Sequence, residues 1–197
     1  MKKREDIELL APAGSFEALV AAVQNGANAI YLGGQKFGAR AFAHNFDYDA
    51  LKEAVQYCHL RDVKLYVTVN TLYNHQEIDE IIPYLEYLYQ IGIDALIIQD
   101  MGLCSLIKKY FPEIEIHMST QASVRNIEGV RYFADQNIDR VVLAREMNIS
   151  EIKAICQNCP IDIEVFVHGA LCMSYSGQCL MSSMNAKRSG NKGECGK

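Results

Sequence analysis

Residues 64–100 have the sequence KLYVTVNTLYNHQEIDEIIPYLEYLYQIGIDALIIQD, in which two apolar runs flank an amphipathic segment. The runs at 64–70 and 95–100 are short and rich in β-branched residues, which favours strands. The segment between them, 76–91, has helical periodicity. Strands that are apolar throughout are typical of parallel sheets covered on both faces. This stretch therefore predicts one strand–helix–strand unit with parallel strands.

The same alternation continues on both sides of this unit. Further strands are predicted at 7–11, 29–33, 115–119, 140–144 and 161–168. Further helices are predicted at 15–26, 47–61, 102–110, 127–136 and 150–159. Even repetition of this kind favours a (β/α) barrel over a doubly wound open sheet. The turn at 11–15, APAGS, also lacks the glycine pattern of a dinucleotide-binding fold.

We therefore expect an α/β fold, a parallel (β/α) TIM-type barrel truncated after its seventh strand. Residues 1–168 are expected to form the incomplete barrel. Residues 169–197 are expected to be a cysteine-bearing loop that leads into a missing C-terminal region. Because an unfinished barrel exposes two strand edges, we expect this chain to be a fragment of a longer protein.

The composition of the chain limits its class. The 197 residues carry a formal net charge of −5, so bulk charge does not indicate nucleic-acid binding. No apolar run is long enough to span a membrane, so no membrane partner is expected. The start of the chain, MKKRED, lacks the pattern of a signal peptide, which predicts a cytoplasmic location.

Polar side chains follow the predicted strands at their carboxyl ends, where barrel enzymes place their active sites. Asn70, Ser119 and Gln121 are candidate substrate-binding residues on this ground. Arg40 and Arg145 are the natural partners of an anionic group, because the guanidinium fork matches a carboxylate. Each of these residues can instead cap a helix or satisfy loop backbone.

The seven cysteines divide into distinct sets. Cys58 and Cys104 fall on apolar helix faces, and Cys156 and Cys159 lie at the end of a helix opposite the predicted active site; a structural role is expected for these four. The remaining three are Cys172, Cys179 and Cys195. They follow the last predicted strand, and thiolates there suit zinc or an iron–sulfur cluster. Their wide spacing favours the cluster over a zinc ribbon.

Several stretches resemble peptidase family U32, the collagenase-like peptidases. They are EVFVHGALC (164–172), GQCLMS (177–182), ELLAPAG (8–14), GANAIYLGG (26–34) and HMSTQA (117–122). Members of this family hydroxylate RNA bases or a quinone precursor with a 4Fe-4S cluster held by cysteines of this loop. The resemblance implies that Cys172, Cys179 and Cys195 are cluster ligands, with a fourth ligand beyond this chain.

The stretch FVHGALCMSYSG (166–177) is most similar to the branch that makes 5-hydroxyuridine at the wobble position of tRNA. This resemblance implies prephenate as co-substrate and tRNA as partner. Arg40 and Arg145 are then expected to hold the carboxylates of a prephenate-like donor. Asp100, Glu146 and His168 are candidates for proton transfer. A short basic run, Lys187, Arg188 and Lys192, either contacts RNA or is a solvated loop.

Two alternatives remain open at this point. The first is a collagenase-like peptidase, with Cys172 as nucleophile and His168 as base. The second is a non-catalytic, cluster-bearing partner subunit that works beside a homologous protein.

Overall fold

The computed structural model describes residues 7–39, 45–169 and 172–195. Seven strands form one sheet whose spatial order equals their order in the chain, and every neighbouring pair is parallel. The strands are β1 (Leu10–Pro12), β2 (Ala29–Gly33), β3 (Lys64–Val69), β4 (Ala95–Ile98), β5 (Glu115–Met118), β6 (Arg140–Val142) and β7 (Asp162–Glu164). Strictly sequential parallel order is the topology of a TIM-type barrel, which confirms the predicted fold class.

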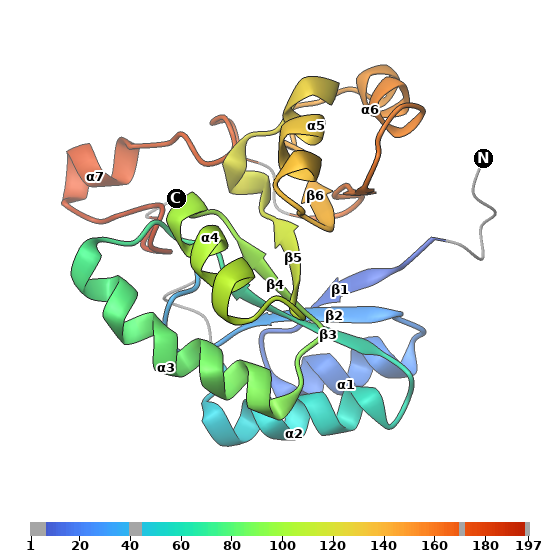
Figure 1. Ribbon diagram of the computed structural model, residues 1–197, viewed down its shortest axis with the longest axis vertical. Coiled ribbons are helices and arrows are strands. Elements are labelled where there is room, and N and C mark those ends of the chain that lie inside the picture. The colour runs from blue at the N-terminus through green and yellow to red at the C-terminus, as the bar shows by residue number, and fades with distance from the viewer. Residues whose placement is uncertain (1–6, 40–44, 170–171, 196–197) are drawn as a thin grey trace.

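A helix follows each of the first six strands and lies on the outside of the curved sheet (Figure 1). The helices are α1 (Phe16–Gln24), α2 (Tyr48–His59), α3 (His75–Ile91), α4 (Met101–Tyr110), α5 (Ile127–Asp135), α6 (Ile149–Cys156) and the late α7 (Met181–Ala186). Among the described residues no pairing joins β1 to β7, so the barrel is open along one side. None of the described helices is long and apolar enough to cross a membrane.

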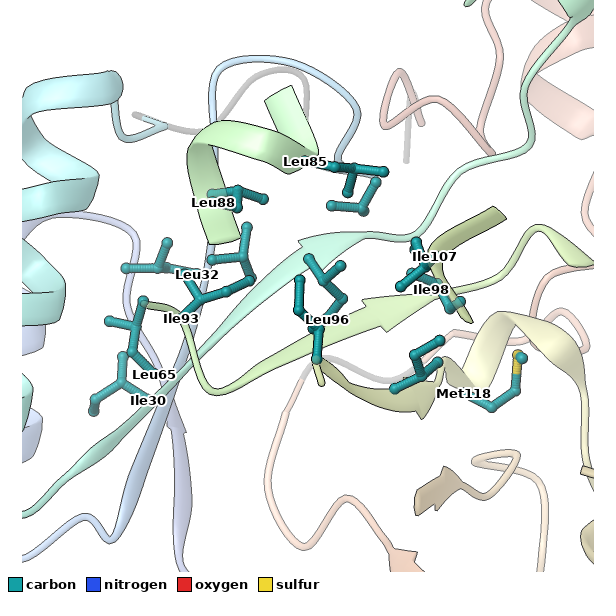
Figure 2. Close-up of a cluster of buried hydrophobic side chains, with 14 of the residues drawn as sticks. Ile30, Leu32, Leu65, Leu85, Leu88, Ile93, Leu96, Ile98, Ile107 and Met118 are labelled. Atoms are coloured by element: carbon teal, nitrogen blue, oxygen red, sulfur yellow. The ribbon is translucent and has the colours of Figure 1, made fainter. Parts of the chain in front are cut away.

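The alternation of side chains along each strand separates two apolar clusters. Figure 2 shows the larger one, in which strand residues such as Ile30, Leu65 and Leu96 meet Leu85 and Leu88 of α3. These side chains are almost completely buried between the sheet and its helices. The next residues along the strands point the other way and form a smaller cluster inside the barrel, made of Ala29, Tyr66, Ala95 and Ile97.

Polar side chains at the start of the helices explain why each helix begins where it does. Ser15, Asp47, Asn74, Asp100, Asn126 and Asn148 each accept a hydrogen bond from a backbone amide in the first helical turn. Two of them, Asn74 and Asn148, also form reciprocal capping boxes with Glu77 and Glu151. Such caps satisfy amides that have no partner within the helix and are worth about 1 kcal/mol each.

The structure differs from the sequence-based prediction in the limits of three strands and in the final segment. β1, β6 and β7 have three residues each, although strands were expected at 7–11, 140–144 and 161–168. β1 and β7 are edge strands that pair with one neighbour only, so fewer hydrogen bonds hold their ends in the ladder. The helix α7 was not predicted, because its six residues have no side-chain cap and no apolar periodicity.

Candidate functional site

A cavity of about 220 Å³ opens at the carboxyl ends of the strands, where the barrel rule places an active site. We call it the mouth cavity. Four of the residues predicted from strand ends line it, namely Asn70, Ser119, Gln121 and Arg145. Tyr31, Glu164 and Phe166, which the strand-end argument did not select, line it as well. The strand-end argument therefore brings four residues to one cavity but identifies only part of its wall.

Three of the predicted lining residues also organise the local backbone. The Asn70 Oδ1 accepts a hydrogen bond from the Ala39 amide at 3.0 Å. The buried Ser119 hydroxyl accepts one from the Gln121 amide at 3.2 Å and so begins the short 3-10 turn Thr120–Ala122. Gln121 is fixed through its backbone, because its carbonyl accepts a hydrogen bond from Gln99 Nε2 at 3.3 Å. These contacts give the cavity wall a defined shape without a ligand.

Glu146 holds the start of the segment that carries the last three cysteines, which we call the cysteine segment (172–195). Its carboxylate accepts hydrogen bonds from the backbone amide of Ser176 and, at 3.0 Å, from the Ser176 hydroxyl. Burial raises the pKa of Glu146, but these hydrogen bonds outweigh it and leave the pKa below its ordinary value. Arg145 donates to the same hydroxyl through Nε at 3.3 Å. Ser176 is only 1% exposed.

Further contacts complete this first anchor of the cysteine segment. The Ser123 hydroxyl donates to the Ser176 carbonyl, and Gln178 Nε2 donates to the Ser123 Oγ at 3.3 Å. Gly177 has a φ of +74°, and a Cβ atom there would collide with the Gln121 carbonyl oxygen. Only glycine fits this position, since both the backbone conformation and the close approach exclude a side chain.

A second anchor holds the other end of the cysteine segment on the opposite side of the mouth. Asn191 accepts a hydrogen bond from the Leu72 amide at 2.9 Å and donates one to Gln99 Oε1 at 2.8 Å. The Lys192 ammonium forms an ion pair with Glu77 at the start of α3. The basic run was expected either to contact RNA or to be a solvated loop, and Lys192 instead links this loop to the barrel.

The remaining predicted residues have different positions. Asp100 caps α4 through the Leu103 amide at 2.8 Å and accepts the Tyr73 amide at 3.2 Å. His168 is exposed and lies beyond the end of β7. Arg40 falls outside the described residues. The proton-transfer roles of Asp100, Glu146 and His168 stay predictions, and two of these three residues have a structural task.

Beneath the mouth cavity lies a group of buried and partly buried polar residues, the floor cluster, most of which the strand-end argument did not select. Its members are Glu8, Tyr66, His117, Arg140 and Glu164. The Arg140 guanidinium lies 2.5 Å from Glu8 Oε1 and 3.5 Å from Glu164 Oε2, and the Tyr66 hydroxyl donates to Glu8 at 2.9 Å. One feature of the sequence indicates the floor cluster: charged residues interrupt strands that are otherwise apolar.

Burial sets the protonation of the floor cluster. Burial raises the pKa of Glu8, but Arg140 more than compensates and leaves that pKa below its ordinary value. For Glu164 burial prevails over Arg140, and the pKa is raised. Burial also lowers the pKa of His117, whose ring packs edge-on against Tyr66 with 4.6 Å between centroids. The Glu115 carboxylate, 3.6 Å from His117 Nε2, opposes this shift only in part.

The cysteines occupy the environments expected for their two sets. Cys58 and Cys104 are buried, and burial raises the pKa of the Cys58 thiol to about 11. Cys172 and Cys195 are exposed and Cys179 is partly so. Three thiols have the donor chemistry that iron prefers. Within the described ranges, however, no three potential ligand side chains gather closely enough to hold a metal ion. The cluster therefore stays a prediction.

Comparison with known proteins places the chain among RNA-modifying relatives. It is 42% identical over 189 residues to the 23S rRNA 5-hydroxycytidine C2501 synthase of Escherichia coli (strain K12), covering 96% of this chain and 28% of that protein. It is 38% identical to the tRNA hydroxylation protein P1 of Bacillus subtilis (strain 168), covering 95% of this chain and 44% of that protein. A collagenase of Porphyromonas gingivalis (strain ATCC BAA-308 / W83) is 34% identical, covering 96% of this chain and 48% of that protein. The chain thus spans less than half the length of these relatives.

The solved structures that match agree on the fold. The U32 peptidase Mk0906 superimposes with a TM-score of 0.69 at 14% identity, over 84% of this chain and 70% of that one. A phosphoribosylanthranilate isomerase from Thermotoga maritima has a TM-score of 0.55 at 10% identity, over 82% of this chain and 77% of that one. At such identities the likeness concerns the barrel alone. The sequence model described as peptidase family U32 matches residues 14–197, and the chain therefore belongs to that family.

Proposed function

We propose that the protein containing this chain hydroxylates a pyrimidine base of RNA, with the reaction taking place at the mouth cavity. The observation that carries the proposal is the similarity to two RNA-hydroxylating relatives, each over at least 95% of this chain. The mouth cavity supports it, because polar groups from several strands meet there around one small space.

The more specific form of the proposal is prephenate-dependent 5-hydroxylation of the wobble uridine of tRNA. Replacing the C5 hydrogen of uracil with a hydroxyl adds one oxygen atom and removes two electrons from the base. The reaction therefore needs an oxygen source and an electron acceptor. A 4Fe-4S cluster held by Cys172, Cys179, Cys195 and a ligand outside this chain would supply one-electron transfer when bound.

Arg145 is the described residue best suited to hold a carboxylate of the co-substrate. It lines the mouth cavity, and the contact between its Nε and Ser176 restricts the direction of the guanidinium fork. Arg40 has the same proposed role. Lys187 and Arg188 are exposed and are proposed to contact tRNA phosphates. Glu146 reaches Arg145 through Ser176, so its proposed role is to position that arginine as well as the cysteine segment.

Replacing Arg145 with alanine tests this proposal. In a strain whose own copy of the gene is deleted, the Arg145→Ala protein is expected to leave tRNA without 5-hydroxyuridine, while wild type restores it. Nucleoside mass spectrometry measures the product. Iron and sulfide content of the protein purified without oxygen is expected to be unchanged, because Arg145 is not a ligand.

Two results would contradict the proposal. Normal 5-hydroxyuridine with Arg145→Ala would remove the carboxylate-binding role. Absence of iron from the wild-type protein, or zinc in its place, would remove the cluster-dependent mechanism.

A peptidase remains a second candidate because one relative over 96% of this chain is named a collagenase. It requires that Cys172→Ser abolishes cleavage of denatured collagen while Cys195→Ser does not. If both variants lose cleavage equally and also lose iron, the two cysteines act as metal ligands and Cys172 is not a nucleophile. A further candidate, a non-catalytic partner subunit beside a homologous protein, requires a stable hetero-oligomer.

A further inference from the structure

Two polar atoms in the wall of the mouth cavity have no hydrogen-bond partner within the described residues. They are Gln121 Oε1 and Glu164 Oε2, and both atoms are buried. The nearest cationic group to the second is Arg140, at 3.5 Å, which is an ion-pair distance and not a hydrogen bond. A buried polar atom left unpaired costs about 1–3 kcal/mol, so a molecule that pairs with both atoms binds with a clear advantage.

The floor of the cavity does not attract an anion. Arg140 lies below it, but its charge is balanced by Glu8 at 2.5 Å. Burial and, to a smaller degree, nearby Glu8 raise the pKa of Glu164 above its ordinary value, against the opposing effect of Arg140. A neutral carboxyl presents one donor and one acceptor side by side, as does the carboxamide of Gln121.

The size and walls of the cavity suit one planar ring. Its volume of about 220 Å³ is below the range of about 300–1,000 Å³ typical of pockets for drug-sized ligands. Tyr31 and Phe166 contribute aromatic surfaces, and Ile97 and Val142 contribute apolar ones.

We propose that the floor of the mouth cavity is a subsite for one pyrimidine base turned out of an RNA strand, hydrogen-bonded along its amide edge by Gln121 and Glu164. Uracil presents N3–H beside a carbonyl oxygen, and cytosine presents N3 beside an amino group. Both edges carry one donor next to one acceptor, which a neutral carboxyl and a carboxamide match. Enzymes that act on bases commonly read a flipped base in this way. This inference rests on the proposed function and adds the place and the two residues that recognise the base.

The experiment is a titration of the isolated protein with uridine, followed by nuclear magnetic resonance and calorimetry, with no turnover. Glu164→Leu and Gln121→Leu are each expected to weaken uridine binding about tenfold, the loss of one buried hydrogen bond. Glu164→Gln is the matched control, because it keeps a neutral donor and acceptor of the same shape. It is expected to bind uridine within about threefold of wild type.

The inference is overturned if Glu164→Leu and Gln121→Leu bind uridine as wild type does. It is also overturned if prephenate, and not uridine, loses affinity in both variants, because the floor then belongs to the co-substrate. If Glu164→Leu fails to fold, the affinity of Gln121→Leu for uridine is the test. Gln121 lies outside the strands, in the short turn Thr120–Ala122, so its replacement is expected to leave the fold intact.

This titration separates the subsite from the proposed function. If tRNA from the cells contains no hydroxylated product dependent on this protein, while uridine still binds through Gln121 and Glu164, the function is wrong and the subsite stands. If hydroxylation is confirmed while neither Gln121→Leu nor Glu164→Leu changes the affinity for uridine, the function stands and the subsite is wrong.

Discussion

At the scale of single residues, His117 is a histidine that is buried inside the barrel in its uncharged form. It is completely buried, its ring packs against Tyr66, and neither ring nitrogen has a hydrogen-bond partner within the described residues. Glu115, Arg140 and Glu8 surround it with charges of both signs. Burial therefore keeps the imidazole neutral, because protonation would place an additional cation in the barrel interior.

This state predicts a pH dependence of stability. The pKa of His117 is lower in the folded chain than the value of about 6.5 in an unfolded one. Below that pH the unfolded state binds a proton that the folded state rejects, so stability falls by at most about 1.4 kcal/mol per pH unit. Between pH 7 and pH 5, His117→Phe is expected to lose less stability than wild type. Urea unfolding at several pH values measures the difference.

The change in stability with pH is compared within each protein, so a constant packing cost of the phenylalanine cancels. The carboxylates whose pKa is lowered, such as Glu8 and Glu115, lose their stabilising contribution only at lower pH as it falls through their folded pKa values. Equal slopes for the two proteins between pH 7 and pH 5 would show that the pKa of His117 is not lowered by folding.

Residues at strand ends can be located from the barrel rule alone, and Asn70, Ser119, Gln121 and Arg145 do line one cavity. Their roles stay predictions. The ion pairs of the floor cluster were missed because a charged residue inside a short strand gives no indication of which distant residue balances it. The partner of Arg140 is Glu8, and the two are 132 residues apart.

At the scale of elements, contacts with the barrel hold the cysteine segment at two places. Glu146 and Ser123 hold Ser176 on one side of the mouth, and Asn191 and Lys192 are fixed on the other. The two anchors limit the positions that the thiols between and beside them can reach. Preorganised ligands lose less conformational entropy when a metal is bound.

Gly177→Ala is expected to release the first anchor. Its Cβ would collide with the Gln121 carbonyl, and its φ of +74° disfavours any other residue by about 1–2 kcal/mol. Hydrogen exchange at the Ser176 amide, which donates to Glu146, is expected to accelerate about tenfold or more. Gly190→Ala is the control, because a Cβ there meets only the Cys179 carbonyl at an ordinary 3.7 Å.

Unchanged exchange at Ser176 in Gly177→Ala would mean that the segment is not anchored through this turn. The sequence showed that the cysteines lie in a loop, but it did not show the anchors or α7. Anchors of this kind depend on side chains that meet across the mouth, such as Glu146 and Ser176, and no local pattern records such a meeting.

At the scale of the whole molecule, the floor cluster connects the two sides of an open barrel. Arg140 belongs to β6, Glu164 to β7, and Glu8 precedes β1 at the opposite edge of the sheet. The Arg140 side chain is only 11% exposed. Removing one member of a buried ion pair leaves its partners as uncompensated charges, which typically costs about 3–5 kcal/mol.

Arg140→Met is therefore expected to lower the free energy of unfolding by roughly 3–5 kcal/mol. Arg131→Met is the matched control, since Arg131 forms an exposed pair with Glu128 on α5 and such pairs contribute less than about 1 kcal/mol. Urea unfolding measures both. If Arg140→Met lowers the free energy of unfolding by less than about 1 kcal/mol, the floor cluster does not stabilise the contact between the two edges of the sheet.

The topology of the whole molecule was the most predictable feature. Alternating strand and helix signals at even spacing fixed the parallel order, and every strand pairs with its neighbour in the chain. The strand limits were less predictable at β1, β6 and β7, which have three residues each, because an apolar run does not show how many of its residues pair with a neighbouring strand.

The sequential order of the strands has a consequence for synthesis on the ribosome. When a new strand leaves the ribosome, the neighbouring strand that precedes it in the chain has already been synthesised. The sheet can therefore form in the direction of translation, and each pairing closes only a short stretch of chain. The Glu8 carboxylate, near the start of the chain, can form its ion pair only after Arg140 has been synthesised. Cys172, Cys179 and Cys195 follow the seventh strand, so they leave the ribosome after the strands whose ends form the mouth, and this mouth can be in place before the three thiols reach it.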